Sequence, residues 1–124
     1  MSLSYHVDEG AGILYWVSIG ADTEEAWDRT CGEAVQVLNS SPHLSALIDH
    51  REHVPTLTTE YVRKVISSIS PPPTGNQPRW ALVVPEGVSY GIGRLAAAHL
   101  EHRGFRAQVF TDYSQAETWL RTER

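Results

Sequence analysis

Apolar and polar residues follow two different periods along this chain, and the two periods distinguish strands from helices. Short apolar runs at Leu3–Val7 and Ile13–Ile19 predict two strands, and the DEGAG sequence between them predicts the turn of a β-hairpin. Further apolar runs predict strands at His43–His50, Arg79–Val84 and Phe105–Phe110.

Four other segments carry apolar residues three and four positions apart, which is typical of amphipathic helices. These segments are Ala21–Ser41, Val54–Ser70, Ser89–Arg103 and Ser114–Glu123. The residues expected to face the core are Trp27, Cys31, Ala34, Val35 and Leu38 in the first helix, Val62, Val65, Ile66 and Ile69 in the second, and Ala116, Trp119 and Leu120 in the last.

Helix starts are predicted from residues whose side chains can accept a backbone N–H. The predicted signals are capping boxes at Asp22 with Glu25 and at Ser114 with Glu117, a cap at Ser89, and a Thr58 cap with a Leu57–Val62 hydrophobic staple.

The predicted element order is ββαβαβαβα, which indicates an α/β fold. Alternating strands and helices favour a mixed, mostly parallel sheet of about five strands packed with helices, and the opening hairpin supplies an antiparallel strand. The Pro-rich segment 71–78 reads as a loop inside one domain that spans residues 1–124.

Charge and composition exclude several classes of partner. The chain has 10 Lys and Arg against 15 Asp and Glu, so clustered basic residues for nucleic acid or anionic membrane are not expected. Its one cysteine, Cys31, cannot form an internal disulfide, and no apolar run approaches the ~18 residues of a membrane span. We expect a cytoplasmic protein without integral membrane association.

Gly91, Gly93 and Ala96 match the G-x-G-x-x-A pattern of dinucleotide-binding turns, with Asp112 downstream. In such a site the first glycine follows the strand directly, whereas here the preceding strand ends near Pro85 and EGVSY intervenes. A nucleotide-binding unit at 91–96 is therefore an alternative, and the favoured interpretation is a helix start that packs closely. No cofactor is predicted.

Several short motifs resemble small proteins with a sporulation anti-sigma-factor-antagonist-like (STAS-like) fold. The helix start with Tyr90, Gly91 and Arg94 resembles a Tyr-Gly and nearby Arg in that family, and LIDHREH resembles its Asp-x-Arg, at Asp49 and Arg51. The last strand and helix also match, at Val109, Phe110, Ala116, Trp119 and Leu120.

The resemblance implies a non-enzymatic binding or regulatory module for a protein partner or for an apolar or anionic small ligand. The residues that it indicates for binding are Asp49, Arg51, Tyr90, Gly91 and Arg94. Arg51 and Arg94 could hold an anionic group, and the alternative is a salt bridge inside the domain, for example to Asp49.

Phosphorylation is a further hypothesis from the same resemblance. The family's regulated members carry a phosphorylatable Ser followed by Gly where this chain reads VPTLTTEYV. Thr58 and Thr59 are the candidate acceptors at that position, but an N-cap role already explains Thr58.

DHREH is the densest cluster of titratable side chains and raises an enzyme or metal-binding alternative. His50 and His53, with Asp49 or Glu52, could ligate a metal if His99 or His102 completed the site, although a loop gives this spacing no fixed geometry. The competing interpretation is a solvated strand end. No catalytic residue is assigned, because Cys31 reads as core and His99 as a helix-border hydrogen-bonding residue.

Tyr15 and Trp16 are adjacent on a predicted strand, so they should point to opposite faces of the sheet. At least one is therefore a candidate for exposure or for contact with a partner. A free edge strand from the hairpin adds a route to homodimerisation.

Overall fold

The computed structural model describes residues 2–20, 24–53, 58–72 and 78–122, and within these ranges it has five strands and four helices. The elements are β1 (Ser2–Asp8), β2 (Ile13–Gly20), α1 (Glu24–Ser40), β3 (Ser45–His53), α2 (Thr59–Ser67), β4 (Arg79–Val83), α3 (Val88–His102), β5 (Arg106–Phe110) and α4 (Tyr113–Arg121). The predicted order ββαβαβαβα is confirmed.

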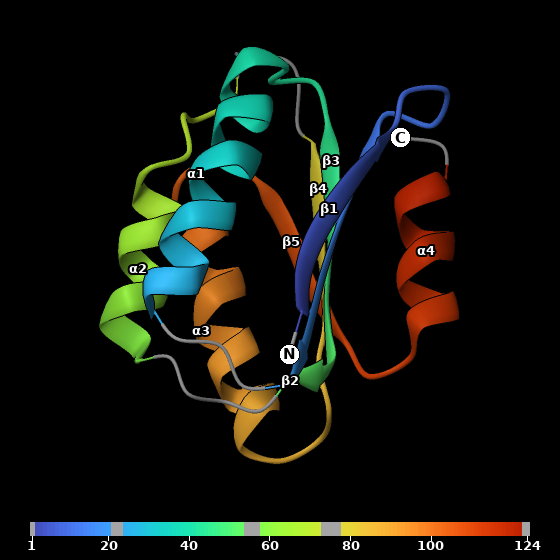
Figure 1. The fold of residues 1–124 in the computed structure, drawn as a ribbon. Coiled ribbons are helices and arrows are strands. Elements are labelled where there is room, and N and C mark those ends of the chain that lie inside the picture. Colours follow the sequence, from blue (N-terminus) through green and yellow to red (C-terminus); the bar gives the residue numbers. More distant parts are fainter. Residues whose placement is uncertain (1, 21–23, 54–57, 73–77, 123–124) are drawn as a thin grey trace.

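The sheet has the order β1-β2-β3-β4-β5, with β1 antiparallel to β2 and all other neighbours parallel. Each parallel strand is added on the same side of the one before it. Because such crossovers are right-handed, α1, α2 and α3 must cover the same face of the sheet. Figure 1 shows these three helices on one face and α4 alone on the other.

Alternating side chains of the strands build a separate core on each face. On the face of α1–α3, Trp16, Ile48 and Trp80 pack with the inward residues of the helices. On the other face, Tyr15, Leu47 and Val83 pack with Ala116 and Leu120 of α4.

Tyr15 and Trp16 do point to opposite faces, as predicted. Both are nevertheless buried within the chain, with 5% and 3% of their surface exposed. The expectation that one of them is exposed or covered by a partner is therefore wrong, because α4 and α1 provide the cover.

Two of the predicted helix starts are wrong and one is confirmed. The Thr58 side chain caps α2 by accepting the Tyr61 N–H at 3.1 Å. In α4 the cap is Asp112, which accepts the Gln115 N–H at 3.0 Å, and not Ser114. The N-cap of α3 is Gly87, so Ser89 lies inside the helix. Asp22 and Leu57 lie outside the described residues.

The strand β3 is longer than the sequence indicated. It continues to His53, so the DHREH cluster belongs to a strand and not to a loop. The pairing of β2 with β3 shifts register between Val17 and Ile19, opposite Asp49 and Glu52. In the described part of the chain, no helix has the length and apolar character needed to cross a membrane.

Candidate functional site

An apolar, partly open cavity of about 120 Å³ lies between the sheet and helices α1–α3. Its lining comprises Trp16, Trp27, Ile48, His50, Tyr61, Val62, Val65, Ile66, Ile69, Trp80, Leu82, Val84, Ile92, Gly93, Ala96 and Leu100. These residues come from three adjacent strands and three helices, so the cavity depends on the whole face of the molecule.

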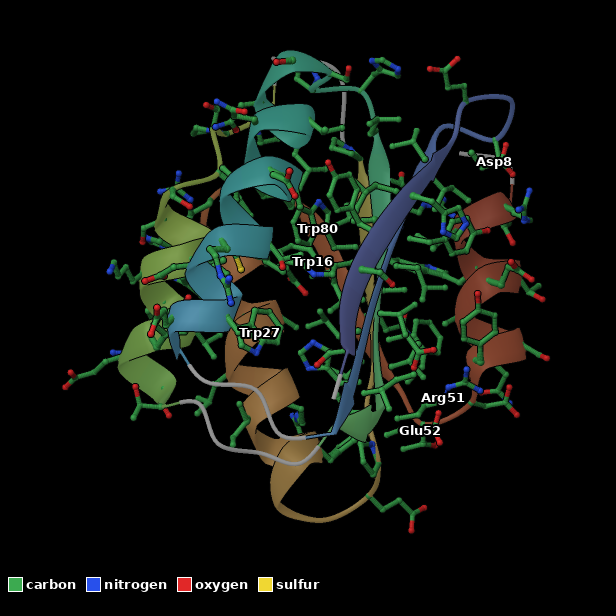
Figure 2. All side chains as sticks on the ribbon, viewed as in Figure 1. Asp8, Trp16, Trp27, Arg51, Glu52 and Trp80 are labelled. Carbon is green, nitrogen blue, oxygen red and sulfur yellow. The ribbon has the colours of Figure 1, made fainter. Side chains whose placement is uncertain are left out.

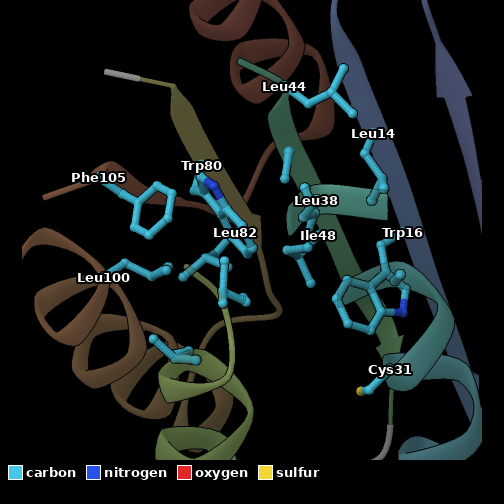
Figure 3. Packing of buried hydrophobic residues seen from close by; sticks show 14 of the residues in the cluster. Leu14, Trp16, Cys31, Leu38, Leu44, Ile48, Trp80, Leu82, Leu100 and Phe105 are labelled. Atoms are coloured by element: carbon cyan, nitrogen blue, oxygen red, sulfur yellow. The ribbon is translucent and has the colours of Figure 1, made fainter. Parts of the chain in front are cut away.

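Alternation along the strands brings the floor of the cavity together. Trp16 on β2 is the register partner of Ile48 on β3, and Ile48 is in turn the partner of Leu82 on β4. Figure 3 shows these side chains on one face of neighbouring strands. His50 lies two residues beyond Ile48 and also lines the cavity.

Gly93 allows α3 to lie close to the sheet. A Cβ atom at this position would stand 3.4 Å from Val109 Cγ1 and 3.5 Å from both Val84 methyl groups. The glycine motif thus belongs to the interior of α3, where Gly93 and Ala96 line the cavity.

The motif does not form the strand-to-helix turn that a pyrophosphate site requires. The backbone N–H groups of Tyr90 and Gly91 both donate to the Gly87 carbonyl, at 3.1 and 3.3 Å. These N–H groups are occupied inside the first turn of α3, which supports the helix-packing interpretation of the motif.

Aromatic rings surround the cavity at tilted angles. The rings of Trp16 and Trp27 lie 5.8 Å apart at 40°, and those of Trp27 and His50 lie 5.4 Å apart at 75°. Figure 2 shows Trp16, Trp27 and Trp80 on the side of the sheet that α1–α3 cover. The Nε1 atoms of Trp16 and Trp80 are buried and have no hydrogen-bond partner among the described residues.

Polar contacts hold α2 over the cavity from both of its ends. The Tyr61 hydroxyl donates to Asp28 Oδ1 on α1 at 2.6 Å. At the other end, Asn39 donates to the Ser68 carbonyl and accepts the Ser70 N–H, and Arg103 donates to the Ile69 carbonyl. Since these bonds fix α2 to α1 and to the end of α3, the space below it is held open.

The cavity continues towards the surface between α2 and α3. Val62, Ile92 and Ala96 are half-buried, and they line both the cavity and a small neighbouring groove. Leu95 borders that groove and is 53% exposed. Thr59 and Arg63 complete the lining of the groove, so both aliphatic and polar side chains lie between the cavity and this surface.

No Asp, Glu, Lys or Arg occurs among the described residues that line the cavity. An ion would lose its hydration there without gaining an opposite charge, which is strongly unfavourable. An uncharged apolar group would instead exchange water contacts for van der Waals contacts with this lining.

Asp49 and Arg51 lie on the opposite face of the sheet and form a pair. The Arg51 Nη2 and Nε atoms donate to the two Asp49 carboxylate oxygens at 2.8 and 2.9 Å, and the guanidinium lies 4.5 Å from the Tyr113 ring centroid. Burial would raise the pKa of Asp49, but the side-chain and backbone hydrogen bonds from Arg51 hold that pKa below its usual value. Figure 2 shows Arg51 on the side of α4.

The other residues indicated by the family resemblance, Tyr90, Gly91 and Arg94, lie on α3. Gly91 and Arg94 are exposed, and Tyr90 is half-buried. Arg51 lies on the side of α4, whereas α3 covers the other face of the sheet. A binding role for these residues stays a prediction.

The remaining candidates have ordinary local surroundings. Burial raises the pKa of the Cys31 thiol to about 12, which disfavours the reactive thiolate. His99 lies 3.3 Å from Ser67 Oγ and joins α3 to α2. Thr58 is a helix cap and Thr59 is the first residue of α2, so phosphorylation there stays a prediction.

The described residues contain no group of three or more His, Cys, Asp or Glu side chains that could hold a metal ion. His50 faces the apolar cavity beside Trp27. The side chain of His53 lies outside the described residues.

The periodicity of the sequence did not indicate the cavity between the sheet and helices α1–α3. The signal that could have indicated it is aromatic: Trp27 is among the residues predicted to face the core, and Tyr61 and Trp80 stand beside apolar residues in predicted elements.

No protein-family model matches the chain, and no curated protein sequence matches it. Its structure, however, is similar to a crystal structure of an uncharacterised protein from the DUF3478 family with a SpoIIAA-like fold, from Shewanella loihica PV-4. The similarity has a TM-score of 0.63 and covers 96% of this chain and 92% of that chain, at 16% sequence identity.

The chain has a SpoIIAA-like fold. This finding confirms the STAS-like resemblance of the sequence motifs and the mixed, mostly parallel sheet. At 16% identity the likeness concerns the SpoIIAA-like fold alone and assigns no ligand, partner or activity.

Proposed function

We propose that this SpoIIAA-like protein is a binding module whose ligand is a small apolar molecule held in the cavity between the sheet and helices α1–α3. The main observation behind the proposal is the cavity itself, which has an apolar lining and is partly open. Of the partners that the family resemblance implies, the proposal selects an uncharged, apolar small ligand.

An unfilled apolar cavity lowers the stability of a fold, which supports the proposal that a ligand fills this one. Protein interiors are close-packed, and a residual cavity destabilises the fold by about 24 cal/mol per Å³. In the partly open space of about 120 Å³, the apolar lining residues lack packing partners on one side. A ligand that fills the space recovers part of this free energy.

The lining supports binding by shape and burial. The three residues shared by the cavity and the surface groove, Val62, Ile92 and Ala96, present only aliphatic atoms on their side chains. Tyr61 directs its hydroxyl to Asp28 and leaves its ring as cavity wall.

The test uses cavity filling. Ala96→Leu places three additional carbons in the cavity wall, and Ala98→Leu makes the same change at an exposed position of the same helix. Ligand-detected saturation-transfer NMR with benzene, toluene and cyclohexane should give signals with the wild type and with Ala98→Leu. The signals should fall at least about tenfold with Ala96→Leu, because its side chain occupies the ligand's volume.

Circular dichroism and a thermal melt establish that both variants are folded. If none of the three compounds binds the folded wild type, the proposal is wrong. Equal binding by the wild type and Ala96→Leu would place the ligand outside the cavity and would contradict it as well.

A further inference from the structure

Flat rings make up much of the cavity wall. Three indole rings, a phenol ring and an imidazole ring line the space, from Trp16, Trp27, Trp80, Tyr61 and His50. They come from α1, α2 and three strands, so a ligand in the cavity meets aromatic surface on several sides.

The volume of the cavity limits the ligand to about one ring. An engineered apolar cavity of about 150 Å³ stays dry and binds benzene or xenon. At about 120 Å³ this cavity is of the same order, so its volume matches a single six-membered ring.

The angles between the rings favour another ring over a saturated ligand of similar size. Trp27 meets Trp16 at 40° and His50 at 75°, so the wall offers both ring faces and ring edges. Aromatic rings prefer offset and edge-to-face contacts at centroid distances of about 4.5–7 Å, and these contacts add free energy beyond burial.

From these observations we infer that the ligand class of the cavity is an uncharged single-ring aromatic compound. The inference rests on the proposed function, because it names the chemistry of the ligand for the same cavity. The selectivity comes from ring contacts with Trp27, Tyr61 and His50, and the size limit comes from the aliphatic side chains of α2 and α3.

The experiment compares three probes on the full chain: benzene, cyclohexane and octanoate. Benzene and cyclohexane are rings of similar size that differ in aromatic character, and octanoate represents a charged acyl chain. Isothermal titration calorimetry measures the dissociation constants, and fluorescence of the lining tryptophans reports occupancy. Benzene should bind about 3- to 10-fold more tightly than cyclohexane, and octanoate should show no saturable binding.

The outcomes separate this inference from the proposed function. Cyclohexane binding as tightly as benzene, or tighter binding of octanoate than of either ring, would overturn the aromatic ligand class and leave an apolar binding site in place. Absence of binding by all three probes would overturn both.

Substitutions at one cavity position supply an internal control. Tyr61→Phe and Tyr61→Leu both remove the hydrogen bond to Asp28, but only Tyr61→Leu also removes the ring. The preference for benzene over cyclohexane should persist in Tyr61→Phe and should fall at least about twofold in Tyr61→Leu. An unchanged preference in a folded Tyr61→Leu variant would contradict the role of the ring wall; if that variant does not fold, the wild-type comparison decides.

Discussion

Asp49 is a buried carboxylate whose charge is stabilised mainly by Arg51. Arg51 supplies two guanidinium hydrogen bonds and its backbone N–H to the carboxylate, and this lowers the pKa of Asp49. Asp49→Asn should therefore lower the free energy of unfolding at pH 7 by about 1–2 kcal/mol, an amount limited by the half-exposed side chain of Arg51. Urea denaturation of both proteins measures the difference.

The sign of the pH dependence follows from the lowered pKa of Asp49. The native state favours the ionised form, so its contribution is complete above the unfolded pKa of about 3.9 and is lost as the pH falls through the lower native pKa. The stability difference between the wild type and Asp49→Asn should shrink below about pH 4. Glu52→Gln, the same change at an exposed position of β3, should alter stability by less than about 0.5 kcal/mol. A difference that grows on acidification would show that the Asp49–Arg51 pair does not stabilise the fold.

At the scale of the element, α3 is a regular helix that contains two glycines. An added Cβ at Gly91 would meet nothing within 4 Å, and the residue does not have a positive φ angle. Gly91→Ala should raise the free energy of unfolding by about 0.5–1 kcal/mol, because alanine loses less conformational entropy in a helix. Thermal and urea denaturation test this prediction.

Gly104, which follows the same helix, should respond to alanine substitution in the opposite direction from Gly91. Its φ angle is +101°, and an added Cβ would lie 3.4 Å from Pro72 Cδ. Gly104→Ala should destabilise the protein by about 1–2 kcal/mol. If Gly91→Ala destabilised the protein to the same extent, Gly91 would have a role that regular helix geometry does not explain.

Local patterns predicted the elements well but not all of their ends. The inward residues of α1 recur every three or four positions, so Trp27, Cys31 and Leu38 could be assigned to the core from the sequence. The cap of α4 could not, because Asp112 and Ser114 can both accept an N–H, and the choice depends on where the chain leaves β5. The end of β3 was missed because pairing with β2 extends the strand through polar residues.

The cavity could not be predicted from periodicity. The pattern assigns Trp27, Val62 and Ile66 to inward faces, but it does not give the distance between those faces. That distance depends on contacts between elements, such as the Tyr61–Asp28 hydrogen bond and the approach of α3 at Gly93. The proposed site is therefore a tertiary property, whereas most of its individual residues are recognisable as buried.

At the scale of the whole molecule, α4 alone covers the second face of the sheet. It packs on β3, β4 and β5, and Tyr15 from β2 also reaches it by donating to Glu117 Oε2 at 2.9 Å. Arg121 on α4 donates to the Tyr15 hydroxyl at 2.8 Å and pairs with Asp8 at the end of β1. Figure 1 shows α4 opposite the three-helix layer. The final helix thus joins the hairpin to the central strands.

Arg79 makes the main polar contact at the C-terminal end of α4. It is 5% exposed, and its Nη1 atom donates to the Trp119 and Thr122 carbonyls at 2.6 and 3.3 Å. Arg79→Met keeps an apolar stem but removes these bonds from helix-end carbonyls, so it should lower the free energy of unfolding by about 1–3 kcal/mol. In hydrogen exchange, the amides of α4 should lose protection before those of β3.

The matched control for Arg79 lies on the neighbouring strand. Arg106 on β5 is the register partner of Arg79 and is exposed, so Arg106→Met makes the same chemical change at a solvent-exposed position. It should change the free energy of unfolding by less than about 0.5 kcal/mol and leave exchange in α4 as it is in the wild type. Because the cavity lies on the other face of the sheet, Arg79→Met should also keep benzene binding while it remains folded. Equal losses in the two variants, or unchanged protection of α4 in Arg79→Met, would mean that apolar packing of Ala116 and Leu120 holds the helix without help from Arg79.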